Sequence, residues 1–251
     1  MRKFGLVGFP LGHSFSKKYF TDKFISESIS DCAYENYELE NLDLLDDIVL
    51  TDREIVGLNI TIPHKTEIFK YCDIADDEAV EVGAVNVLKI KYTNGKRLIM
   101  GFNTDIFGFE ESLVPHLTGR KINSAIMLGS GGSSKAVEYV LKKLGINIIH
   151  VSRSLKGKSI SYKELTDKIL TENRLIINTT PLGMFPDIET LPDLNYSSLT
   201  PGHILFDLVY NPEITSFLKE GRKQGSMIIG GLQMLHLQAE RSWKIWNDSQ
   251  V

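Results

Sequence analysis

The chain has 251 residues, of which 42% are hydrophobic and 24% charged, as in an ordinary globular protein. Its formal net charge of -4, without a block of Lys and Arg, argues against a nucleic-acid-binding protein. No stretch approaches the roughly 20 apolar residues of a membrane span, and the start MRKFGLVGFP is basic without the long apolar stretch of a secretory signal, so we expect a cytoplasmic protein without membrane partners. Cys32 and Cys72 lack disulfide or metal-ligand spacing, so we expect two reduced thiols and no metal.

The first hundred residues alternate apolar strands with helices. Strands are predicted at residues 3–8, 34–39 and 55–60, and helices around Phe20, at residues 42–50 and from about Thr66. Residues 85–92 and 97–103 flank Asn94-Gly95, the strongest short hairpin signal. This segment therefore predicts an α/β sheet with an antiparallel edge.

The second segment begins near Ile106 and has the rhythm of a doubly wound nucleotide-binding fold. After a helix through Leu113, strands are predicted at residues 125–128, 146–151, 175–178, 204–208 and 227–229, with a helix at residues 135–144. Apolar residues recur at helical spacing over 232–246, so this last helix needs a hydrophobic partner surface on one or both domains.

A glycine-rich loop lies between the first strand and the first long helix of this second segment. Gly129 and Gly131 let the backbone turn tightly and approach a pyrophosphate, and the helix that follows offers unpaired N–H groups. The strand after that helix ends in Ser152-Arg153-Ser154, where an NAD-binding domain usually carries an acid. Arg153 and the hydroxyls suit the 2′-phosphate of NADP, although Arg153 as a solvated surface residue is the simpler alternative.

Polar side chains gather at loops and strand ends of the first segment. In open α/β sheets, ligands bind outside the carboxyl ends of strands, so we expect these groups to converge on a hydroxylated ligand with one carboxylate. Taken singly, each also has a structural explanation as a helix cap, a turn or a solvated helix start. The candidates are Ser14, Ser16, Thr61, Lys65, Asn86 and Asp105.

Lys65 and Asp105 are the candidates for proton transfer. Oxidation of an alcohol requires a group that takes the hydroxyl proton as hydride leaves, and carbonyl reduction requires its return. A partly desolvated lysine can release its proton near neutral pH, and a carboxylate beside it would orient the ammonium. The sequence does not decide which of the two is the base.

Ordered motifs along essentially the whole chain resemble the shikimate dehydrogenase family. They are GHSFS, NITIPHK, GAVN, GFNTD, GSGGSS, NTTPLGM, DLVYNP and GGLQMLHLQA. The resemblance implies an N-terminal α/β substrate domain (residues 1–105 with 232–251), a Rossmann-type NADP domain (residues 106–231) and a C-terminal helix that returns to the first domain. It also implies reversible NADPH-dependent reduction of 3-dehydroshikimate to shikimate in aromatic amino-acid biosynthesis.

Site residues follow from the resemblance motif by motif. Those implied to bind shikimate are Ser14, Ser16, Thr61, Asn86, Asp105, Tyr210 and Gln238, with Lys65 as the catalytic base or acid. Those implied to bind NADP are Gly129, Ser130, Gly131, Gly132, Ser133, Ser152, Arg153, Ser154, Leu208, Gly231 and Asp77.

Two other functions stay open at this point. One is a quinate/shikimate dehydrogenase with relaxed substrate or cofactor choice, against which Ser14 and Ser16 argue. The other is a non-catalytic NADP-binding sensor, against which the retained Lys65 and Asp105 argue. A homodimer is compatible with the sequence.

Overall fold

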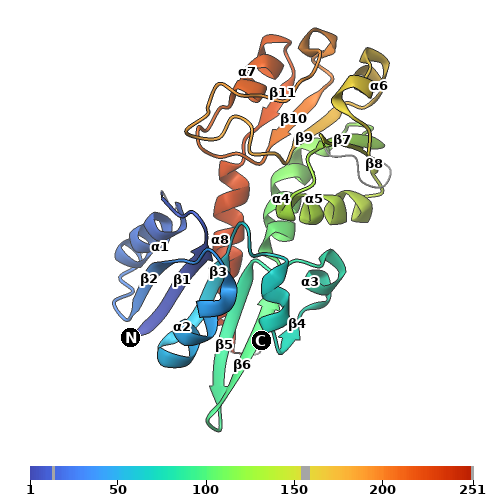
Figure 1. Ribbon diagram of the computed structural model, residues 1–251. Helices are drawn as coiled ribbons and strands as arrows, with labels where there is room; N and C mark the ends of the chain where they lie inside the picture. Colours follow the sequence, from blue (N-terminus) through green and yellow to red (C-terminus); the bar gives the residue numbers. More distant parts are fainter. Residues whose placement is uncertain (13–14, 154–158, 250–251) are drawn as a thin grey trace. The chain divides into compact units, whose positions relative to one another are not determined.

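The computed structural model describes residues 1–12, 15–153 and 159–249, and the chain folds into two compact units (Figure 1). Unit 1 contains Met1–Thr104 and Ala239–Val251, and unit 2 contains Asp105–Gln238. This division assigns Asp105 and residues 232–238 to unit 2, whereas the sequence prediction placed them in the first domain.

Unit 1 is built on a six-stranded sheet in the order β2-β1-β3-β5-β6-β4. The strands are β1 (Arg2–Gly8), β2 (Cys32–Glu38), β3 (Ile55–Ile60), β4 (Ile74–Ala75), β5 (Val87–Thr93) and β6 (Lys96–Phe102). The chain leaves β1 for β2 on one side and returns to β3 on the other, so β1 is the point where the strand order reverses. In such sheets the loop after this strand is a preferred ligand site.

The prediction of an antiparallel edge is wrong. The antiparallel strand is β5, which lies inside the sheet between β3 and β6, and the edge is β4, which runs parallel to β6. With two residues, β4 is too short to produce a period-2 pattern, so the sequence did not predict it. The β5–β6 hairpin itself is confirmed, with Asn94 and Gly95 both at positive φ (51° and 76°).

The helices of unit 1 are mostly short. They are α1 (Phe15–Ser26), η1 (Leu42–Leu44), α2 (Leu45–Thr51), η2 (Glu67–Tyr71) and α3 (Asp77–Val82), with the carboxyl-terminal part of α8 (Leu232–Asn247). The segment predicted to become a helix from about Thr66 forms only the 3₁₀ helix η2. Helix α3 begins where the Asp76 side chain accepts a hydrogen bond from Ala79 N (2.8 Å), and it ends at Gly83 with φ 64°.

Two hydrophobic clusters form the core of unit 1, because successive side chains of a strand point to opposite faces. Phe4 of β1 packs in one cluster with Phe20 and Phe24 of α1, and Val7 belongs to the other. Trp246 of α8 joins the first cluster, with its ring 4.8 Å from the Phe4 ring between centroids. The predicted hydrophobic partner of the last helix is therefore this face of the first sheet.

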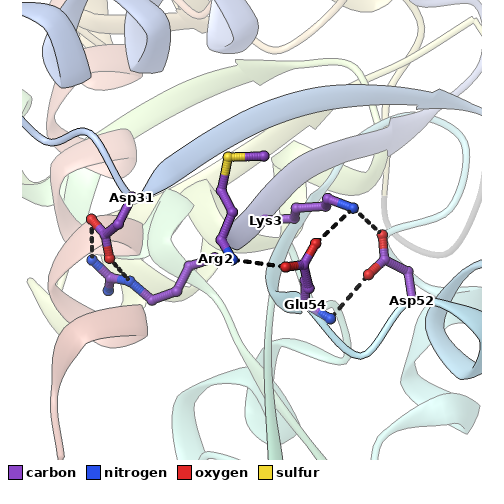
Figure 2. A network of polar contacts seen from close by, with 6 residues as sticks. Arg2, Lys3, Asp31, Asp52 and Glu54 are labelled. Atoms are coloured by element: carbon purple, nitrogen blue, oxygen red, sulfur yellow. Dashed lines mark hydrogen bonds and ion pairs between the residues drawn. The ribbon is translucent and has the colours of Figure 1, made fainter.

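Charged side chains surround the start of β1 (Figure 2). Arg2 bonds to Asp31 at 3.0 Å, and Lys3 lies 2.7 Å from Asp52 and 3.0 Å from Glu54. These residues precede or begin the three parallel strands, so the pairs join the three strand starts at the surface. Partly exposed pairs of this kind contribute roughly 0–1 kcal/mol each.

Unit 2 is a parallel five-stranded sheet of Rossmann type, in the order β11-β10-β9-β7-β8. Its strands are β7 (Ser124–Leu128), β8 (Asn147–Val151), β9 (Leu175–Asn178), β10 (Ile204–Asp207) and β11 (Met227–Ile229). Its helices are α4 (Thr104–Leu117, of which Thr104 belongs to unit 1), α5 (Gly132–Lys143), η3 (Tyr162–Glu164), α6 (Asp167–Glu172), η4 (Tyr196–Ser198), α7 (Ser216–Lys223) and the first part of α8. Here the strand order reverses at β7, the strand that leads into the glycine loop.

Candidate active site

A buried chain of polar side chains crosses the core of unit 1. The Tyr34 hydroxyl on β2 donates to Asn59 Oδ1 on β3 at 2.8 Å, and Asn59 Nδ2 donates to Ser242 Oγ on α8 at 3.0 Å. Ser16, in the first turn of α1, is buried, and its side chain interacts with the Tyr34 phenol so as to lower the pKa of that phenol, against the larger effect of burial. Burial raises the pKa of Tyr34, so the phenol stays protonated and remains a donor to Asn59.

The same chain continues from Ser242 to Asn86. Ser242 Oγ lies 3.3 Å from Thr104 Oγ1, which accepts a hydrogen bond from Asn86 Nδ2 at 3.1 Å. Asn86 Oδ1 accepts from the backbone N–H of Thr104 at 2.7 Å. The structure thus joins two predicted substrate residues, Ser16 and Asn86, through side chains that the sequence did not single out for this role.

Lys65 follows the carboxyl end of β3, in a turn whose backbone is held by hydrogen bonds of His64 and Lys65. His64 is buried, and its Nε2 lies 2.6 Å from the carbonyl oxygen of Leu39. The carbonyl of Lys65 accepts a hydrogen bond from Val85 N at 2.8 Å. Thr61 continues the pairing of β3 with β1, since its N–H donates to Val7 O at 2.9 Å. The Lys65 side chain is half-buried on this fixed backbone.

Three of the predicted substrate residues belong to unit 2. Asp105 lies in the first turn of α4 and is buried. Gln238 is buried on α8, where its Nε2 donates to Leu235 O at 3.1 Å. Tyr210 follows β10 and is half-buried, and desolvation raises the pKa of its phenol, which therefore stays neutral. Ser14 lies outside the described residues.

The glycine loop of unit 2 fits a phosphate group. Gly129 has φ 103°, and a Cβ there would lie 2.8 Å from Thr179 Oγ1, so the turn requires glycine. Gly131 precedes α5 in an extended conformation without a side-chain cap, and a Cβ at this residue would meet open space. The first N–H groups of α5, which begins at Gly132 and includes Ser133, are thus positioned for an anionic ligand.

A cavity of about 530 Å³ adjoins this loop in unit 2, and its lining includes Gly129, Ser130 and Ser152. Ser152 is buried at the end of β8, and its N–H donates to Ile160 O at 3.0 Å. Arg153 is exposed, as both a 2′-phosphate ligand and a surface residue would be. Ser154 lies outside the described residues.

The loop after β10 is held by a buried carboxylate, Asp207. It accepts hydrogen bonds from Asn178 Nδ2 (3.0 Å), Val209 N (3.0 Å) and Thr215 Oγ1 (2.5 Å). Leu208, a predicted cofactor residue, lies between two of these anchors, and a Cβ on Gly231 would lie only 2.3 Å from its carbonyl oxygen. Close packing of Gly231 against this backbone explains the glycine, and the sequence did not indicate that Asp207 holds this loop.

The remaining cofactor candidate, Asp77, is exposed at the start of α3 in unit 1, whereas the other cofactor candidates are residues of unit 2. Within the part of the chain that is described, no group of three or more His, Cys, Asp and Glu side chains is arranged to hold a metal ion. In the same residues, no helix combines the length and the apolar character needed to cross a membrane.

Comparison with known proteins gives consistent matches. Residues 6–88 match the family model described as the shikimate dehydrogenase substrate binding domain. The shikimate dehydrogenase (NADP(+)) of Clostridium beijerinckii is 36% identical over 261 residues, covering 100% of this chain and 94% of the relative. That of Methanococcus maripaludis is 37% identical over 263 residues, covering 96% and 90%.

Solved structures of shikimate dehydrogenases are also similar to this chain. A shikimate dehydrogenase crystallised with NADP+ has a TM-score of 0.86 at 34% identity, covering 98% of this chain and 90% of that chain. The enzyme of Thermus thermophilus, solved with NADP(H) and shikimate, has a TM-score of 0.84 at 27% identity, covering 98% and 94%.

Proposed function

The chain belongs to the shikimate dehydrogenase family, and we propose that it is an NADP-dependent oxidoreductase that reversibly reduces 3-dehydroshikimate to shikimate, a step of chorismate and aromatic amino-acid biosynthesis. The observation that carries this proposal is the full-length match at 36% identity to an NADP-dependent shikimate dehydrogenase. The match covers both the unit that holds Lys65 and the unit that holds the glycine loop.

The cofactor site of the proposal is in unit 2. The uncapped start of α5 and the turn at Gly129 would hold the pyrophosphate, and Ser152 and Arg153 would bind the 2′-phosphate together with Ser154. Bound NADP supplies a hydride acceptor or donor for the ring carbon of the substrate. The fit is chemical: N–H groups and a guanidinium meet phosphates, and no acid follows β8 to favour NAD.

On the substrate side, we assign proton transfer to Lys65 or Asp105. In the oxidation of shikimate, the hydroxyl proton passes to one of these groups while the hydride leaves the same carbon, and in the reduction both return. The hydroxyl and amide groups of Ser14, Ser16, Thr61, Asn86, Tyr210 and Gln238 would bind the carboxylate and the remaining hydroxyls. Hydrogen-bonding groups of this kind discriminate strongly against ligands that leave them unpaired.

The test is reduction of NADP and of NAD with shikimate and with quinate, for the wild type and for Lys65→Ala. We expect turnover of shikimate with NADP, reduced by at least about 100-fold in Lys65→Ala, which is the scale of one general acid–base group. Lys70→Ala is the matched control, because Lys70 is an exposed lysine five positions away, paired with Glu67.

Each other outcome has a clear meaning. Turnover of quinate but not shikimate would replace the substrate, and turnover with NAD but not NADP would replace the cofactor. Tight NADP binding without turnover of either acid would support the sensor and refute the enzyme. A cytoplasmic location, a homodimer and the absence of nucleic-acid and membrane partners stay predictions from the sequence.

A further inference from the structure

We infer that Tyr34 and Ser242 are positioning residues, which hold the substrate-binding groups Ser16 and Asn86 through a buried hydrogen-bond chain centred on Asn59. The hydrogen bonds run from Tyr34 through Asn59, Ser242 and Thr104 to Asn86, all within unit 1. At the Tyr34 end, the buried Ser16 side chain interacts with the phenol. The inference rests on the proposed function, because it assigns a role toward the substrate of that same site.

The hydrogen bonds have a fixed direction at Asn59. Its Oδ1 accepts from the protonated Tyr34 phenol at 2.8 Å, so its Nδ2 must face Ser242, to which it donates at 3.0 Å. Without the hydroxyl of Tyr34 or of Ser242, the Asn59 amide can flip, or one of its polar atoms stays in the core without this hydrogen bond. Asn59 lies on β3, which ends at Ile60, so this anchor stands two residues before Thr61 and six before Lys65, and the Thr61 N–H still pairs with Val7 O of β1.

The surroundings keep the Tyr34 ring in one position. Phe20 stacks on it with ring centroids 4.6 Å apart and planes 12° apart, and Tyr34 is 3% exposed. The phenol therefore cannot swing away from Asn59 without opening the aromatic cluster.

At the other end of the chain, Ser242 joins α8 to Thr104 and, through Thr104, to Asn86. Its hydroxyl, on a fully buried side chain, lies between Asn59 Nδ2 and Thr104 Oγ1, and Thr104 holds both polar atoms of the Asn86 amide. The orientation of Asn86 thus depends on a residue 138 positions from Thr104 in sequence.

Burying a chain of polar side chains costs free energy unless every polar atom has a hydrogen-bond partner. Apolar side chains at these positions would fill the core without that cost. The two ends of this chain are the reason to interpret it functionally, because each end is a candidate ligand for shikimate. The chain fixes which atom of each amide or hydroxyl remains available to the substrate, which is how a surrounding shell preorganises a binding site.

The experiment measures KM and kcat for shikimate and for NADP in Ser242→Ala, Tyr34→Phe and the double variant, together with calorimetric binding of shikimate and the melting temperature. We expect each single variant to raise the KM and the Kd for shikimate roughly 3- to 10-fold, the effect of one neutral hydrogen bond, while KM for NADP changes less than about 2-fold. In the double variant, the fold-rise of KM for shikimate should be smaller than the product of the two single rises, because both residues act through Asn59.

Ser112→Ala is the matched control. Ser112 is equally buried on a helix, but its hydroxyl donates to Gly108 O within α4, and Ser112 belongs to unit 2. We expect Ser112→Ala to lower the melting temperature slightly, as Ser242→Ala does, but to leave KM for shikimate unchanged. Ser242→Thr, which keeps the hydroxyl, should restore KM toward the wild-type value even if its extra methyl lowers the melting temperature.

An unchanged KM and Kd for shikimate in both single variants, with only a lower melting temperature, would overturn the inference and leave the proposed function intact. Equal rises of KM for shikimate and NADP would also overturn it, because the effect would then be a general loss of structure. A wild type that neither binds nor oxidises shikimate would overturn both proposals.

Discussion

Replacing Asp207 by Asn should change how the stability of unit 2 depends on pH. Asp207 is fully buried at the end of β10, and burial raises the pKa of its carboxyl to about 7, although three donors contact the carboxylate and oppose the rise. In the unfolded chain the same carboxyl has a pKa of about 3.9. Between about pH 4 and 7 the folded unit therefore keeps a proton that the unfolded chain has released.

Because the folded state binds more protons in this window, the free energy of unfolding falls as pH rises through it. Three pH units at about 1.4 kcal/mol each set the loss at about 4 kcal/mol. Below pH 4 both states are protonated, and above pH 7 both are ionised, so the contribution of Asp207 is constant there. The Asn variant has no such proton, so the difference in stability between it and the wild type should shift by about 4 kcal/mol across the window.

Urea unfolding at intervals from pH 4 to 8 measures this difference. Trp243 and Trp246 are the only tryptophans and both belong to unit 1, so their fluorescence follows unit 1 while circular dichroism also follows unit 2. The fluorescence transition should have the same pH dependence in both proteins, which makes it an internal control. Parallel pH dependence of the dichroism transition in the wild type and Asp207→Asn would refute the reasoning.

Three further substitutions test buried contacts, two of them close packing at a glycine and one a pair of hydrogen bonds. Gly57→Ala would place a Cβ 2.4 Å from the Trp246 ring, so we expect a loss of about 1–3 kcal/mol and a shifted tryptophan emission in urea unfolding, and an unaltered spectrum would contradict it. Gly231→Ala would place a Cβ 2.3 Å from the carbonyl oxygen of Leu208, so KM for NADP should rise more than KM for shikimate in steady-state kinetics. Lys89→Met removes the buried ammonium that donates to the carbonyl of Ile245 at 2.7 Å and to that of Asp248, so denaturation should show a loss of about 1–3 kcal/mol, whereas Lys91→Met should show little.

Local chemistry explains which parts of the fold were predictable. Long apolar runs such as residues 55–60 and 204–208 became buried strands, and Asn94-Gly95 formed its hairpin because both residues accept positive φ. The place of a strand within the sheet does not depend on its own sequence alone. Strand β5 pairs with β3, with Leu88 opposite Leu58, and no pattern within either strand specifies that pairing. The edge strand β4 has too few residues to carry a pattern at all.

In the candidate site, too, local motifs were predictable from the sequence and long-range contacts were not. Loop motifs made Ser16, Lys65, Asn86 and the glycine loop candidates, because polar residues and glycines at strand ends stand out against apolar runs. Tyr34 lay in a predicted strand and Ser242 in the predicted last helix, and the sequence made neither of them a candidate site residue. Their role depends on Asn59 Nδ2 meeting Ser242 Oγ across 183 positions of sequence, which only the folded chain shows.

The place of Trp246 in the first aromatic cluster has a consequence for biosynthesis. The cluster around Phe4 and Phe20 stays incomplete until the carboxyl-terminal helix has been made, whereas Asp105–Gln238 is one continuous stretch. At about 5–20 residues per second, the ribosome needs roughly 7–30 s to pass from residue 104 to residue 246. During that interval the nascent amino-terminal sheet exposes an aromatic surface to chaperones and to neighbouring chains, while the nucleotide-binding unit already has all of its residues before the last helix is finished.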